Sequence, residues 1–148
     1  MKETSAFESF ELGINSEIKD YLTETVKWSS FLAILGFVGV GLMIFAGIIM
    51  GITGAASSGL ASAYGAGYAS GIALFYIILA AVYFFPVMYL FRFSKSMKSA
   101  LKQENNNDFA KAFSSLKSHY KFLGIFSIVL ISLYILVIIG AVIGASLF

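Results

Sequence analysis

Side chains that commonly carry catalysis or bind metals are scarce in this chain. Cysteine is absent, and His119 is the single histidine. A metal site needs several nitrogen, oxygen or sulfur ligands that converge. A nucleophile needs a base within hydrogen-bond reach. That base would have to be His119 or Glu104, and no recognisable motif pairs either of them with a serine nucleophile. We therefore expect no enzyme, no cofactor and no metal site, and we interpret His119 as a packing residue.

Transport chemistry is also poorly supported by the residue types. Residues 28–91 and 122–148 contain no Asp, Glu, Lys, Arg or His. Proton- and ion-coupled carriers usually bury such a side chain within a membrane span. The glycines lie in apolar runs and form no phosphate-binding loop of the Walker type. These absences argue against coupled transport and nucleotide hydrolysis.

The uncharged runs indicate the fold class instead. The chain of 148 residues is 59% hydrophobic and 12% charged, whereas a soluble domain carries about 25% charged residues. A helix needs roughly 20 apolar residues to cross a bilayer. We therefore predict an all-α membrane protein with three transmembrane helices, at about 28–54, 71–91 and 122–148. The net charge of +2 is too small to suggest a nucleic-acid partner.

A basic segment at 92–121 separates the second and third spans. It carries seven of the ten basic residues, and its apolar residues recur at helical spacing on both sides of Asn105–Asn107. This pattern predicts a helical hairpin that extends both spans, with Asp108 as the cap of its second helix. Because basic residues mark the cytoplasmic side, we expect the hairpin and the N-terminus in the cytoplasm and the C-terminus outside.

The N-terminal residues precede the first span. We predict that residues 1–14 form a flexible acidic tail and that residues 15–148 form a single three-span membrane domain. Residues 15–28 predict an amphipathic helix, because Ile18, Tyr21, Leu22 and Val26 recur at spacings of three and four. This helix could pack on the hairpin as a continuation of the first span, which its net acidic face favours, or lie on the membrane surface.

Some residues are candidates for contacts rather than chemistry. Small residues four apart allow close helix approach in membranes, and Pro86 predicts a kink because it removes a backbone donor. Basic residues beside a span attract anionic lipid or an acidic partner. The candidates are Gly47, Gly51, Gly140 and Gly144 for helix packing, Pro86 for the kink, and Arg92, Lys95, Lys98 and Lys102 for lipid or partner contact.

Three segments together resemble a known family. They are Lys27–Phe37 (KWSSFLAILGF), Tyr83–Lys98 (YFFPVMYLFRFSKSMK) and Leu116–Ile125 (LKSHYKFLGI). Their order resembles a domain-of-unknown-function family of small integral membrane proteins from Bacteroidota-type bacteria, over roughly residues 16–148. The resemblance implies a bacterial inner-membrane location and supplies no catalytic or binding residues.

Two functions remain open from the sequence. The first is a non-enzymatic component of a membrane complex, oligomeric or accessory, whose partners are the bilayer, anionic lipid at the basic hairpin, and either further copies of the chain or another membrane protein. The alternative is a homo-oligomeric channel or carrier for a small solute. Its pore would use Ser127, Ser132, Tyr76 and Tyr83.

Overall fold

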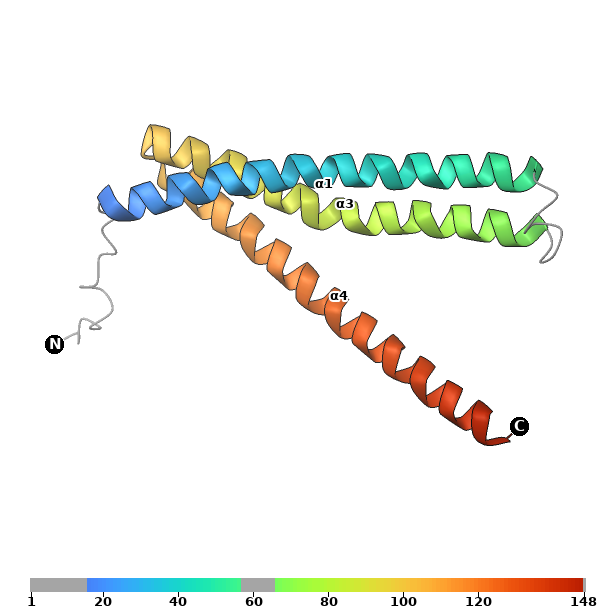
Figure 1. Ribbon diagram of the computed structural model, residues 1–148. Coiled ribbons are helices and arrows are strands. Elements are labelled where there is room, and N and C mark those ends of the chain that lie inside the picture. Colours follow the sequence, from blue (N-terminus) through green and yellow to red (C-terminus); the bar gives the residue numbers. More distant parts are fainter. Residues whose placement is uncertain (1–15, 57–65, 148) are drawn as a thin grey trace.

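The computed structural model describes residues 16–56 and 66–147, and these residues form three long helices (Figure 1). The helices are α1 (Ser16–Ala56), α3 (Ala66–Gln103) and α4 (Asn106–Leu147). All three are long and apolar enough to cross a membrane. The all-helical fold and the three candidate spans are therefore confirmed. The predicted acidic tail, 1–14, lies outside the described residues, as do residues 57–65 of the first connection.

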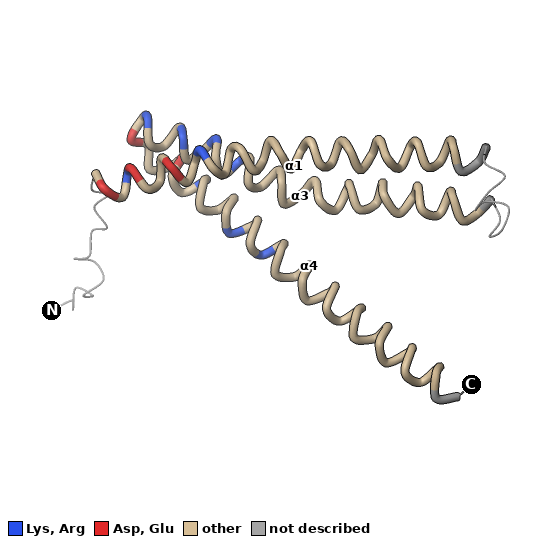
Figure 2. Tube along the Cα trace, in the orientation of Figure 1, with Lys and Arg blue, Asp and Glu red and all other residues tan. Residues whose placement is uncertain are grey.

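Each helix extends beyond the span predicted for it. The predicted amphipathic helix and first span form one continuous helix, α1. The helix α3 runs through Pro86 and includes the first half of the basic segment. Charged residues gather where α1 begins, α3 ends and α4 begins, so that one end of the molecule is polar and the rest is uncharged (Figure 2). The predicted bend at Pro86 stays a prediction.

The helices α1 and α3 pack along a seam that repeats every seven residues. On α1 the seam consists of Val26, Ala33, Val40 and Gly47, all buried. On α3 it consists of Ala73, Ala80, Val87 and Ser94, of which all but the half-buried Val87 are buried. A seven-residue repeat keeps one face of each helix against its partner over many turns. Because most of these residues are small, the two backbones lie close together.

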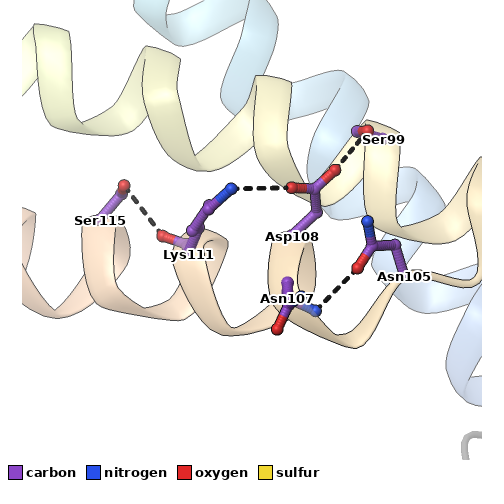
Figure 3. Close-up of polar contacts among 6 residues, drawn as sticks. All are labelled: Ser99, Asn105, Asn107, Asp108, Lys111 and Ser115. Carbon is purple, nitrogen blue, oxygen red and sulfur yellow. Dashed lines mark hydrogen bonds and ion pairs between the residues drawn. The ribbon is translucent and has the colours of Figure 1, made fainter.

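A compact turn joins α3 to α4. The Asn105 backbone N–H donates to the Ala100 carbonyl at 3.3 Å, and Glu104 has a φ of 51°, in the left-handed region. This is a Schellman ending of α3, with Glu104 in the position that glycine usually takes. Asn105 then caps α4, because its side-chain oxygen accepts from the Asn107 N–H at 2.9 Å (Figure 3). The prediction that Asp108 is the cap was wrong: Asp108 lies inside the first turn.

The helix α4 diverges from the other two (Figure 1). It packs against α3 near the turn, and no described residue of α1 comes within 8 Å of it between Cα atoms. Every residue from 127 to 143 is exposed. The uncharged part of α4 is therefore held to the molecule at one end only.

Candidate functional site

The three helices meet in an apolar cluster at the polar end. Val26 of α1, Phe93 and Met97 of α3, and Ala112 of α4 are buried together. Phe93 and Met97 are the largest fully buried side chains among the described residues. The residues of α1 predicted to be amphipathic thus place Val26 against α3, and Leu22 packs at the edge of the same cluster. This cluster fixes the start of α1 against the turn between α3 and α4.

Buried serines link α1 to α3 beside this cluster. Ser94 is 3% exposed, and its hydroxyl donates to the Val26 carbonyl at 3.3 Å. Ser30 and Ser94 also share a hydrogen bond between their hydroxyls. No buried side-chain nitrogen or oxygen in the described residues lacks a hydrogen-bond partner. Ser30 and Ser94 are therefore bonded to each other, and Ser94 also to the α1 backbone, so that they join the two helices.

His119 has a defined partner far away in the sequence. Its Nδ1 lies 2.8 Å from the Pro86 carbonyl oxygen, and because a carbonyl can only accept, Nδ1 carries the proton. Next to this bond, Phe122 stacks on Phe85 with ring centroids 6.3 Å apart, and Phe126 meets the edge of Tyr83 at 6.3 Å. These contacts are where α4 leaves α3. The expectation that His119 is a packing residue agrees with this geometry.

A second polar group lies at the turn (Figure 3). Asp108 accepts from the Ser99 hydroxyl at 2.7 Å and pairs with Lys111 at 3.4 Å. The hydrogen bond from Ser99 is the main reason that the pKa of Asp108 lies below its usual value, with Lys111 adding to the shift and partial burial opposing it. Through its hydrogen bond with Ser99, the Asp108 carboxylate links α4 to α3.

The four glycines chosen from the sequence lie in different surroundings. A Cβ on Gly47 would lie 3.1 Å from the Ala73 carbonyl oxygen, and one on Gly51 would lie 3.5 Å from the Ala73 Cβ. A Cβ on Gly140 or Gly144 would meet nothing within 4 Å. Gly47 and Gly51 therefore lie against α3 of the same chain, whereas Gly140 and Gly144 contact no other described helix.

Gly36 was not among the helix-packing candidates chosen from the sequence, although it lies tightly against α3. A Cβ on Gly36 would lie 2.6 Å from the Val87 Cγ2. The signal that could have found this region is the seven-residue spacing from Val26 to Gly47, in place of the four-residue spacing of Gly47 and Gly51. It would also have identified the α3 face that receives α1.

The basic candidates lie on α3, and the pore candidates are divided between α3 and α4. Arg92, Lys95, Lys98 and Lys102 are exposed along α3. The pore candidates lie on two helices: Tyr76 and Tyr83 belong to α3, and Ser127 and Ser132 belong to α4. The Ser132 hydroxyl donates to the Ile128 carbonyl of its own helix at 2.8 Å.

Contacts between helices are the main feature of the described residues at the polar end. No group of three or more His, Cys, Asp or Glu residues within 16–56 and 66–147 could hold a metal ion. The polar contacts of Ser30 with Ser94, of Ser99 with Asp108, and of His119 with the Pro86 carbonyl each join one helix to the next. These contacts thus join the three helices at the polar end, and the apolar part of α4 diverges from there.

Comparison with known proteins identifies a family. A model described as a family of unknown function (DUF5362) matches residues 63–143. Neither a curated protein nor a solved structure matches the chain. The matched region includes the resembling segments Tyr83–Lys98 and Leu116–Ile125, but Lys27–Phe37 lies outside it, so that the match is narrower than the expected 16–148. Because the match covers more than half of the chain, the protein belongs to the DUF5362 family.

Proposed function

We propose that this protein is a non-enzymatic component of a membrane assembly, in which the apolar part of α4 contacts other membrane helices, first of all α4 of a second copy. The proposal places the three helices across a bacterial inner membrane. The polar end, with the hairpin of α3 and α4 and the start of α1, lies in the cytoplasm, and the C-terminus lies outside. The basic residues between the spans support this orientation.

The exposure of α4 from residue 127 to residue 143 is the observation that supports the contact. Apolar helices are not driven together inside a bilayer by the hydrophobic effect, so that close packing of small residues decides which helices associate. The chain uses Gly47 for its own α1–α3 pair, where the space beside the backbone is filled. Gly140 and Gly144 keep open space beside the backbone, and another helix could approach there.

Replacement of both open glycines tests the proposal. Gly140→Leu together with Gly144→Leu should convert the oligomer to monomer, measured as particle mass after extraction in native lipid. The matched control is Gly124→Leu on the same helix, because a Cβ on Gly124 also meets nothing within 4 Å. Since a Cβ at each of these three positions meets nothing within 4 Å, the helix content of the monomer should be unchanged by circular dichroism.

Cross-linking gives a second measurement. The chain has no cysteine, so that Ala141→Cys creates a single thiol on the exposed part of α4. Under mild oxidation it should form a dimer, and Lys111→Cys at the polar end should not. A monomeric mass for the unmodified protein, or equal masses for the double variant and its control, would contradict the proposal. Solute conduction by reconstituted protein would favour the channel instead.

A further inference from the structure

One face of α3 carries four basic residues, Arg92, Lys95, Lys98 and Lys102. We propose that this basic face binds anionic phospholipid headgroups through the end nearest the uncharged run, Arg92 and Lys95. The four residues follow each other at spacings of three, three and four, and all are exposed. Residues between them, Phe93, Met97 and Ala100, are buried. The basic face therefore points away from the other helices.

The charges of the basic face are not neutralised within the described part of the chain. Of the two acidic residues near the turn, Glu104 pairs with Lys19 at 3.5 Å, and Asp108 pairs with Lys111 at 3.4 Å. Neither ion pair among the described residues includes a residue of the basic face. Four cations thus remain available to an external anion.

The position of these cations along the bilayer normal favours a lipid headgroup as the anion that they bind. Arg92 directly follows the uncharged run 28–91. The bond from Ser94 to the Val26 carbonyl sets the adjacent Trp28, 60% exposed, at a similar height on α1. Tryptophan prefers the interface between headgroups and acyl chains. Arg92 and Trp28 therefore mark one membrane boundary on two neighbouring helices.

The spacing along α3 predicts unequal roles for the four cations. At 1.5 Å per residue, Lys95 lies about 4.5 Å, Lys98 about 9 Å and Lys102 about 15 Å beyond Arg92. Charges are screened over about 8 Å at physiological salt. Arg92 and Lys95 should therefore contact the phosphates, and Lys102 should contribute little. An acidic protein segment would instead use the whole length of the basic face, which distinguishes it from a lipid.

Quenching of a tryptophan by brominated lipid tests the proposal. Trp28 is the single tryptophan, so that Trp28→Phe with Phe91→Trp places the reporter beside Arg92. The control reporter is Trp28→Phe with Leu74→Trp, near the opposite end of the α3 apolar run. Each is reconstituted into phosphatidylcholine vesicles that contain phosphatidylglycerol. In one series of vesicles the phosphatidylglycerol is brominated, and in a second series the phosphatidylcholine. The two quenching curves give the binding constant of phosphatidylglycerol relative to phosphatidylcholine at the reporter.

We expect phosphatidylglycerol to be preferred at position 91 by about fivefold for each cation in contact, with no preference at position 74. Arg92→Gln with Lys95→Gln should abolish the preference. Lys98→Gln with Lys102→Gln should reduce it far less, and Lys111→Gln, a loss of charge from an ion pair, should leave it unchanged. High salt should weaken the preference.

Other outcomes would overturn the proposal. Equal binding of both lipids at position 91 would do so, and so would a preference that survives Arg92→Gln with Lys95→Gln. An effect as large from the Lys98 and Lys102 pair would indicate an acidic partner. Absence of quenching at position 74 by either lipid would instead refute membrane insertion itself. The lipid preference does not depend on α4 contacts, so that it can fail while the proposed assembly holds.

Discussion

Leucine in place of Gly47 should force α1 away from α3. A Cβ at this position would lie 3.1 Å from the Ala73 carbonyl oxygen and 3.2 Å from the Tyr76 Cβ, closer than the 3.4 Å at which ordinary contact begins. The three further carbons of leucine have no space in the seam. Overpacking of a filled contact typically costs about 1–3 kcal/mol. This cost should appear as a lower free energy of unfolding.

Gly41 supplies a matched control on the same helix. It is exposed, and a Cβ there would meet nothing within 4 Å. Leucine at either position gains the same roughly 0.8–1 kcal/mol of helix propensity over glycine. The difference between the two variants therefore isolates the packing cost, and Gly47→Leu should be the less stable by about 1–3 kcal/mol.

Denaturation in mixed micelles measures the difference. The protein is unfolded reversibly by increasing the fraction of dodecyl sulfate in a mild detergent, and helicity is followed by circular dichroism. Equal free energies of unfolding for Gly41→Leu and Gly47→Leu would refute the close α1–α3 approach. A loss of stability confined to Gly41→Leu would show that the other face of α1 is the packed one.

Three further perturbations act at the polar end and can be followed in the same assay. His119→Phe removes the donor to the Pro86 carbonyl and should cost about 0.5–1.5 kcal/mol; an unchanged midpoint would contradict that bond. Because the Ser99 hydroxyl lowers the pKa of Asp108 in the folded state, the ionised carboxylate stabilises the fold above the unfolded pKa, and this stabilisation is lost as pH falls through the folded pKa. Ser99→Ala should therefore flatten the loss of stability in acid, and an unaltered acid slope would argue against this. Glu104→Gly removes the cost of a left-handed conformation, about 1–2 kcal/mol, which stabilises the fold. Glycine also raises the conformational entropy of the unfolded chain, which opposes folding by about 0.4–1 kcal/mol. The substitution should be stabilising, because the exposed pair with Lys19 contributes little, and a destabilised variant would contradict the Schellman ending.

The number and kind of helices could be predicted from the sequence because they depend on local properties. Uncharged runs long enough to cross a bilayer, such as 28–54 and 122–148, are visible in composition alone. The charged end was equally visible, because basic residues cluster at 92–121. Continuity of α1 through Trp28 was one of two outcomes that the amphipathic pattern allowed.

The contacts between helices were harder to predict from the sequence. A glycine in an apolar run can face lipid or another helix with the same neighbours in sequence, and Gly47 and Gly140 illustrate the two cases. The bond between His119 and Pro86 joins residues 33 positions apart, and no local pattern links them. The divergence of α4 has no sequence signal, because apolar residues suit lipid and protein neighbours alike.

Because the uncharged part of α4 is attached at one end only, its tilt is not fixed by contacts with the described residues of α1. From the aromatic contacts at Phe126 to Ala145 the helix extends about 29 Å at 1.5 Å per residue. A rotation of about 10° at those contacts would carry the far end sideways by about 5 Å. Bilayers of different thickness can be matched by such changes of tilt at a cost of fractions of a kcal/mol per Å. In the proposed membrane placement, a change in the tilt of α4 would therefore alter the thickness that this one helix spans, and the α1–α3 seam would not have to change.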